Sequence, residues 1–232
     1  MISETAPRTK RFLSLRIKIW FVFILIFTPV FIASYIWFYL YTSDRVLNSI
    51  SEDLIDTIQG AVMGMNVDGF VTLYEEEHAN NPKCPPGPED ENGYYPENPL
   101  YWEHVTWLSR IGDLEPQARL YTYIKGEQPD EIIAIGSSGA LWDPPAGFMF
   151  CQRYSSGGAT QIYDGLTARV DVWKPYKDAY GEWITTYMPI EKDGKIVGAI
   201  GVDILASYVR EVQGGIVRNG LFAFVVSYIL IF

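Results

Sequence analysis

The chain is poor in the residues that most often build metal and redox centres. Its 232 residues include only two cysteines, Cys84 and Cys151, and two histidines, His78 and His104. The cysteines form no Cys-x-x-Cys pair and have no histidine near them, so the sequence offers no zinc site. We therefore expect neither a metal nor a cofactor. The two cysteines either pair in one disulfide, as an even number outside a membrane allows, or remain two buried thiols.

Positive charge is scarce as well. The chain has 18 Lys and Arg against 28 Asp and Glu, a net charge of −10. Five of the basic residues lie in the first 18 positions, where Glu4 is the only acid. The rest of the chain is therefore more acidic than the total suggests. Such a domain repels a phosphate backbone, which argues against nucleic acid as a partner.

Catalytic signatures are missing too. The sequence has no GxSxG, HExxH, Walker or dinucleotide-binding pattern. His78 follows the acidic run Glu75–Glu77, which is typical of a solvated helix face, and His104 has no catalytic partner nearby in the sequence. We expect no enzyme in these 232 residues.

What the sequence does have is a long uncharged run close to its start. Trp20–Tyr41 contains no charged residue, and as a helix it would span about 33 Å, enough to cross the hydrocarbon core. The basic cluster before it predicts a cytoplasmic N-terminus and an extracytoplasmic continuation. The alternative is a cleaved signal peptide, but the run is long for one and no small-x-small cleavage site follows it.

A second apolar run begins at Leu221 and extends to Phe232. It is too short to span a membrane alone, so it is either an apolar tail or the start of a second transmembrane helix that is cut short. We favour the second interpretation. The predicted organisation is a cytoplasmic segment at 1–19, a transmembrane helix at 20–41, an extracytoplasmic domain at 42–215 and a truncated transmembrane helix at 216–232. The chain is then expected in the inner (plasma) membrane, in contact with lipid.

Helical spacing continues beyond the first apolar run. Ser43 to about Leu73 is predicted to be a long helix that continues the membrane span. Its apolar stripe has spacings of four, four, four and three, at Val46, Ile50, Leu54, Ile58 and Ala61. This stripe packs either on the chain's own sheet or on a second copy of the helix. The part near the membrane is the better dimer seam, so we expect a homodimer.

The remaining segments predict an α+β domain with a five-stranded antiparallel sheet. Residues 80–99 are rich in proline and read as a loop, and 100–111 return to helical spacing. Alternation with period two then predicts a hairpin from 119–125 and 131–135. Residues 136–167 read as irregular. Three more strands are expected at 168–173, 182–190 and 195–204, followed by a short helix at Ala206–Gln213.

Two parts of this sheet resemble a known family, the extracytoplasmic Cache (PAS-like) sensor domains of bacterial receptors. PYKDAYGEWITTYMPI and KDGKIVGAIGVDIL, within 171–205, are similar to that family's closing strand pair. ARLYTYIKGEQPDEIIAIGSSG, which starts at Ala118, is similar to its opening hairpin. The resemblance covers about 43–215 and implies a PAS-like five-stranded sheet on a long N-terminal helix, with a small-molecule pocket between sheet and loops. A single sheet unit implies the single-Cache type.

The resemblance also suggests ligand contacts. Family members that bind amino acids carry a Tyr-x-Asp before the penultimate strand, an Asp late in the last strand and an Arg-x-Trp-Tyr cluster upstream. Here Tyr176-Lys177-Asp178 matches the first element and Asp203 the second. In place of the cluster the chain has Cys151-Gln152-Arg153-Tyr154. The resemblance therefore implies a ligand that is an amine, amino-acid-like or neutral, without assured recognition of an α-carboxylate.

Each candidate ligand-binding residue has an alternative structural explanation. Asp203 either meets a ligand ammonium or caps the exit helix, and Asp178 either lines the pocket or shapes a turn. Arg153 and Arg169 either clamp a carboxylate or form surface ion pairs. The aromatic residues of the strands form either a box that suits an amine or a plain aromatic core. They are Tyr121, Tyr123, Trp173, Tyr176, Trp183 and Tyr187.

We therefore predict a ligand-sensing input domain of a membrane-bound bacterial signal-transduction protein. Ligand binding would act through the second transmembrane helix on an output module, such as a histidine kinase, a nucleotide or diguanylate cyclase or a phosphatase. The first alternative is a module of the same fold that dimerises or binds a periplasmic protein and has no small ligand. An extracytoplasmic enzyme would need an acid and base in one cleft, and a sensor of membrane state or pH is a further alternative.

Overall fold

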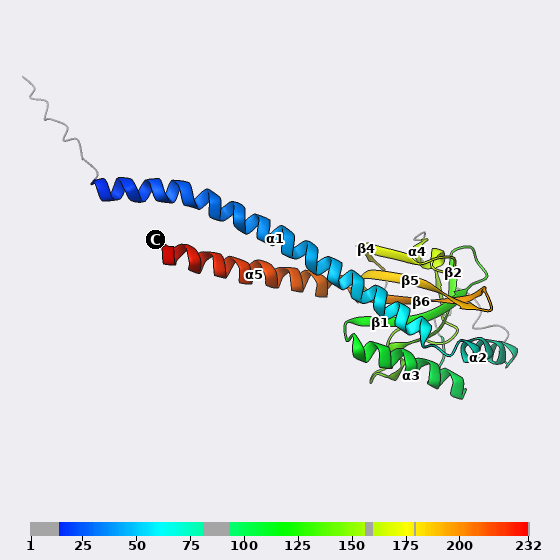
Figure 1. The fold of residues 1–232 in the computed structure, drawn as a ribbon. Helices are drawn as coiled ribbons and strands as arrows, with labels where there is room; N and C mark the ends of the chain where they lie inside the picture. Colours follow the sequence, from blue (N-terminus) through cyan, green and yellow to red (C-terminus); the bar gives the residue numbers. More distant parts are fainter. Residues whose placement is uncertain (1–13, 81–92, 156–159, 179, 232) are drawn as a thin grey trace, which may run out of the picture. The chain divides into compact units, whose positions relative to one another are not determined.

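The computed structural model of the chain describes residues 14–80, 93–155, 160–178 and 180–231. These residues form two compact units. One unit contains the described residues up to Arg45 together with those from Gln213 onward, and the other contains Val46–Val212. Two long helices, α1 (Leu15–Met63) and α5 (Ala206–Ile231), each contribute to both units (Figure 1).

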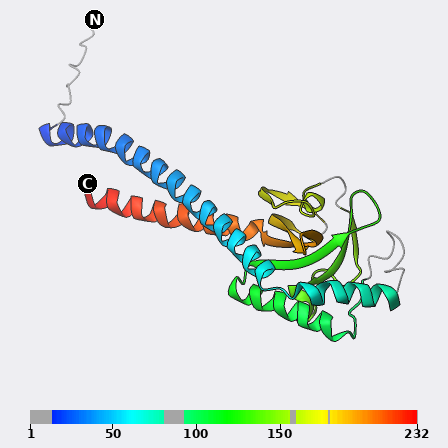
Figure 2. The same ribbon diagram turned by 45° about the vertical axis from the view of Figure 1, so that its right-hand side comes forward.

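In the first unit, α5 lies beside the N-terminal part of α1 (Figures 1 and 2). The hydroxyls of Thr28 and Tyr228 share a hydrogen bond of 2.6 Å, and the Tyr35 hydroxyl donates to the Val217 carbonyl at 3.2 Å. Helix α1 continues through Pro29. Both helices are long and apolar enough to cross a membrane, judged by length and composition. The segment limits at 20–41 and 216–232 stay predictions.

In the second unit, the apolar stripe of α1 packs inside the domain. Leu54, Ile58 and Ala61 are fully buried, and Ile50 packs against the same core. This part of the stripe therefore meets the chain's own fold. Whether a second copy covers the rest stays a prediction.

The helix that the sequence predicted to reach Leu73 is interrupted. Helix α1 ends at Met63, and α2 begins at Val67 and runs to Asn80. Asn66 causes the break, because its side-chain oxygen accepts the backbone N–H of Gly69 at 2.9 Å, which is the bond of a helix N-cap. The stripe from Val46 to Ala61 lies wholly within α1, so its spacing did not reveal the break.

The fold is α+β, with a PAS-like antiparallel sheet of six strands in the order β3-β2-β1-β6-β5-β4. The strands are β1 (Ala118–Lys125), β2 (Glu131–Ser137), β3 (Arg153–Ser155), β4 (Val170–Lys177), β5 (Glu182–Lys192) and β6 (Lys195–Leu205). The helices of this unit besides α1, α2 and α5 are α3 (Pro99–Leu114), the 3-10 helix η1 (Ser138–Leu141) and α4 (Gln161–Asp164).

The sheet has one strand more than predicted. The extra strand, β3, consists of three residues that pair with the outer edge of β2, too few to produce a period in the sequence. Strand β4 also runs further than expected, to Lys177, past Pro175 and a register shift. Proline is tolerated there because β4 is an edge strand. The predicted exit helix at 206–213 is the first part of α5.

The two faces of the sheet are covered differently. On one face the strands pack against α1, α2 and α3, and the strand residues Leu120, Ile135 and Val202 are fully buried there. Figure 2 shows α2 and α3 lying together along that side. On the other face, a smaller cluster includes Tyr121, Tyr123 and Tyr187 beneath Phe148 and Ile162. Irregular segments cover this second face, and they leave a cavity.

Candidate functional site

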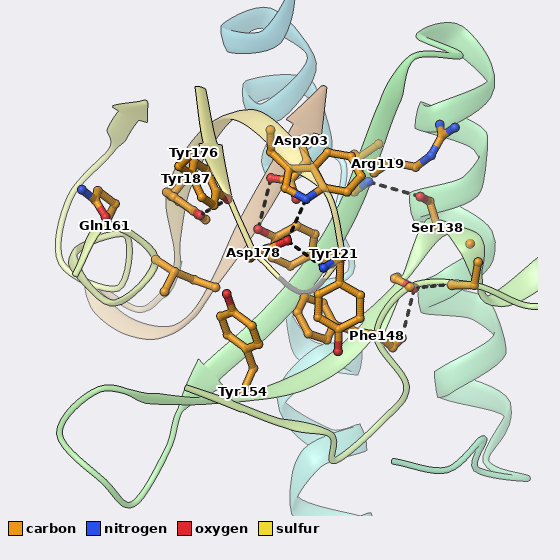
Figure 3. Close-up of a pocket in the computed structure, with 18 of the residues that line it drawn as sticks. Arg119, Tyr121, Ser138, Phe148, Tyr154, Gln161, Tyr176, Asp178, Tyr187 and Asp203 are labelled. Carbon is orange, nitrogen blue, oxygen red and sulfur yellow. Dashed lines mark hydrogen bonds between the residues drawn. The ribbon is translucent and has the colours of Figure 1, made fainter. Parts of the chain in front are cut away.

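A cavity of about 290 Å³ opens on the aromatic face of the sheet. Its floor is formed by Tyr121 of β1, Tyr187 of β5 and Asp203 of β6. Segments after β2, strand β3, helix α4 and the β4–β5 turn supply the walls. In the close-up of Figure 3, Asp203 and Tyr121 lie at the centre of this arrangement, with Tyr154 below them and Gln161 at one side.

Asp203 is the most unusual group in the cavity. Its residue is 9% exposed, and the hydroxyl of Tyr121 donates a hydrogen bond to its carboxyl oxygen at 3.2 Å. Burial raises the pKa of this carboxyl to about 7, although hydrogen bonds from Thr185 and Tyr121 partly oppose the shift. At neutral pH the group is thus close to half-ionised. A cation next to Asp203 would favour the ionised carboxylate and form a strong charge-assisted hydrogen bond with it.

The structure decides between the two roles that the sequence left open for Asp203, a cavity-lining residue or the cap of the exit helix. Helix α5 begins at Ala206, whereas Asp203 lies within β6 and lines the cavity. Its position in the strand, three residues before the helix, directs it to Tyr121 instead of to the helix N-terminus. The helix-capping alternative is therefore wrong.

Tyrosine hydroxyls continue the polar network on the floor. The Tyr176 hydroxyl is 3.0 Å from the Thr185 hydroxyl and 3.1 Å from that of Tyr187. Burial raises the pKa of Tyr176 and of Tyr187, and Asp203 adds to both shifts. Burial likewise raises the pKa of Tyr154 to about 12, with Asp178 adding to it. These phenols stay neutral, so they offer hydroxyl groups and aromatic faces to a ligand.

The position of Tyr121 depends on Gly201, the residue opposite it on β6. A Cβ at position 201 would lie 2.5 Å from Cζ of the Tyr121 ring, far inside van der Waals contact. Only glycine lets this ring lie flat on the neighbouring strand and reach Asp203, two residues further along. The glycine thus positions one of the carboxyl's hydrogen-bond donors.

Asp178 holds the β4–β5 turn together. One of its carboxyl oxygens accepts the backbone N–H groups of Tyr180 and Gly181 at 2.8 and 2.9 Å, and the indole N–H of Trp183 at 3.0 Å. The residue therefore shapes the turn, as the sequence suggested, and it also lines the cavity. Through this turn it places Tyr180 and Trp183 in the cavity wall.

Six of the ten candidate residues named from the sequence line the cavity: Tyr121, Tyr176, Asp178, Trp183, Tyr187 and Asp203. The other four do not line it. Tyr123 is fully buried beside the cavity and donates to the Ile162 carbonyl at 2.6 Å, and Trp173 is 38% exposed on the edge strand.

The two candidate arginines form ion pairs outside the cavity. Arg153 pairs with Glu131 and Glu127 at 3.2 and 3.5 Å, and Arg169 pairs with Asp171 at 3.4 Å.

Sequence reasoning missed several lining residues, of which Arg119 is the most important. Arg119 lies two residues before Tyr121 on β1, and residues two apart in a strand share a face. The two-residue spacing from Tyr121 could therefore have identified Arg119 from the sequence. The lining residues that cover the sheet could not be identified in this way, because they lie on irregular segments without a periodic pattern. They include Trp142, Phe148, Tyr154, Gln161 and Tyr180.

Cys151 is buried and is not a free thiol. Cys84 lies outside the described residues, so the Cys84–Cys151 disulfide stays a prediction. If the two cysteines pair, proteolytic peptide mapping without reductant will yield one linked peptide that separates into two on reduction. Recovery of two separately alkylated thiols from unreduced protein would contradict the pairing.

No family model matches the chain, and no curated protein does. Among solved structures, the chain is similar to the sensory domain of the Campylobacter jejuni chemoreceptor Tlp3 with isoleucine bound, at 14% identity and a TM-score of 0.35, over 75% of this chain and 66% of that one. It is also similar to the sensor domain of the V. cholerae histidine kinase DctB, at 13% identity and a TM-score of 0.39, over 73% and 60%. A GAF domain from a Coxiella burnetii phosphoenolpyruvate-protein phosphotransferase follows at 11% identity and 0.33, over 71% and 99%. The chain spans less than two thirds of the first two structures.

Proposed function

We propose that this chain is the input part of a membrane-bound signal-transduction protein and that it binds a small ligand with a cationic ammonium group in the Asp203 cavity. The observation that carries the proposal is a buried carboxyl in a cavity that eight aromatic side chains help to line. Aromatic faces attract cations. An ammonium next to Asp203 supplies a positive charge that favours the ionised form of this carboxyl. The sequence resemblance to Cache-type sensors and the two apolar helices support the same function.

The cavity is also connected to the start of α5, both along the chain and through contacts between neighbouring residues. Asp203 lies on β6, which continues directly into α5 at Ala206. Trp183, which lines the cavity, is paired in the sheet with Leu205, the last residue of β6. Glu182 forms an ion pair with Arg210 of α5 at 2.9 Å. A ligand that binds differently to two arrangements of these strands would therefore bias the start of α5.

The binding part of the proposal is tested by thermal unfolding of the full chain in detergent micelles with a panel of primary and quaternary amines. A ligand at about 100 times its dissociation constant should stabilise the folded protein by about 2.7 kcal/mol. Asp203→Asn, which keeps the shape but removes the charge, should abolish the response. Asp193→Asn, at the exposed β5–β6 turn, changes the net charge equally and should retain it.

The pH dependence of binding gives a second readout. Because the pKa of the Asp203 carboxyl is raised to about 7, the carboxyl is mostly neutral at pH 6 and mostly ionised at pH 8. Affinity for a permanently charged quaternary amine should therefore rise about tenfold between these pH values. A pH-independent affinity, or amine binding that survives Asp203→Asn, would place the ligand elsewhere. If the well-folded protein is stabilised by none of the amines, the dimerisation or partner-binding alternative is favoured.

A further inference from the structure

Arg119 brings a positive charge to the same cavity. Of the lining residues that the structure describes, it is the only lysine or arginine. It stands near the start of β1 and is the direct cross-strand partner of Asp203 on β6. Side chains of directly opposed residues start out close together on one face of a sheet. An ion pair between the two residues would thus be the simplest outcome.

The structure shows a different arrangement. Within the described ranges, no carboxylate approaches the Arg119 side chain within 4.0 Å. The guanidinium instead stacks on the ring of Trp142, 4.5 Å from its centroid. One nitrogen, Nη1, donates to the carbonyls of Pro116 and Ala118 at 3.0 and 3.1 Å. Figure 3 shows the Arg119 side chain extending away from Asp203, on the opposite side of the cavity from Gln161.

These contacts hold the cation in place without neutralising it. Arg119 is half-buried, and burial lowers the pKa of its guanidinium. A partly desolvated charge without a counter-ion is unfavourable, whereas a guanidinium held at a cavity wall is well suited to bind a carboxylate. Asp203 does not serve as the counter-ion, because its carboxyl is turned to Tyr121.

We infer that the ligand carries a carboxylate, bound by Arg119, in addition to the ammonium held near Asp203. This inference rests on the proposed function and narrows its ligand class to zwitterions. It also changes the sequence-based expectation. The missing Arg-x-Trp-Tyr cluster argued against recognition of a carboxylate, but Arg119 supplies a guanidinium from a different strand.

The test uses four probes with the same carbon skeleton: pentylamine, pentanoate, 5-aminopentanoate and 2-aminopentanoate. Binding to the full chain in detergent micelles is measured by calorimetry and by thermal unfolding. At least one zwitterion should bind more tightly than pentylamine, and the two amino acids distinguish a distant carboxylate from an adjacent one. In Arg119→Ala the dissociation constant of that zwitterion should rise about 10- to 100-fold. The value for pentylamine should stay within about twofold.

Two further variants separate recognition from structural damage. Arg119→Lys keeps the charge but loses the planar fork, so it should fall between wild type and Arg119→Ala. Arg169→Ala removes a charge from a partly exposed arginine that pairs with Asp171 outside the cavity, and it should bind all probes as wild type does. Unchanged pentylamine binding in Arg119→Ala would show that the variant is folded.

The outcomes distinguish this inference from the proposed function. If pentylamine binds as tightly as both zwitterions, or if the advantage of a zwitterion survives Arg119→Ala, the carboxylate site is wrong while the amine site stands. If pentanoate alone binds and depends on Arg119, the ammonium part of the proposed function is wrong. If no probe binds, the proposed function fails and this inference fails with it.

Discussion

Asp203→Asn is expected to stabilise the folded protein at pH 8 and to leave it nearly unchanged at pH 4. The pKa of the Asp203 carboxyl is raised from 3.8 to about 7, chiefly by burial. The folded state therefore binds a proton more tightly than the unfolded state, and stability falls as the pH rises from about 4 to about 7. The full difference is on the order of 4 kcal/mol. Asparagine carries no titrating group and still offers an oxygen to Tyr121.

The measurement is the free energy of unfolding of both proteins between pH 4 and pH 8, without added ligand. The difference between variant and wild type isolates Asp203 from all other titrating groups. Asp193→Asn is the matched control, since Asp193 is exposed and has a positive φ of 51° that asparagine adopts readily. A constant difference across this pH range would mean that Asp203 does not titrate as its burial implies.

Gly201→Ala is expected to destabilise the protein by about 1–3 kcal/mol and to weaken any binding that depends on Asp203. The added Cβ would lie 2.5 Å from Cζ and 2.7 Å from the hydroxyl oxygen of Tyr121. This ring is 5% exposed and packs against Phe148 and Tyr123, so it has little room to move. Its displacement would also remove the hydrogen bond to Asp203.

Two comparisons make this prediction specific. Gly60→Ala in α1 meets no atom within 4 Å and should be neutral or stabilising by up to about 1 kcal/mol, as is usual for alanine in a helix. In a Tyr121→Ala background, Gly201→Ala should lose most of its cost, because the two residues are coupled. Destabilisation of equal size in both backgrounds would show that the Tyr121 ring is not the cause.

The hydrophobic pattern was enough to predict five of the sheet's strands, but not their order in the sheet. Alternation between Leu120 and Ile124 on one face and Tyr121 and Tyr123 on the other predicted β1, because each face is buried against different partners. The turn between β5 and β6 suits its sequence, because Asp193 and Gly194 both have positive φ, which these residue types adopt readily. The three residues of β3 and the cap at Asn66 left no comparable periodic trace.

The candidate site was only partly predictable, for a related reason. Asp203, Tyr121 and Tyr187 lie on regular strands, where chain position fixes the face. By contrast, Trp142, Phe148 and Tyr154 reach the cavity through irregular segments, and the alternative roles of Asp178 and Asp203 depended on which atoms surround them.

By itself, the sequence determined the α+β class, the positions of five strands along the chain and the two apolar segments, because these follow from local periodicity and hydrophobicity. Only the tertiary structure decided that Asp203 is buried beside Tyr121, that Arg119 shares its cavity without pairing with it, and that Arg153 is instead engaged by Glu131. Charge interactions depend on distance and desolvation across strands, and neither quantity is encoded in the spacing of residues along one strand.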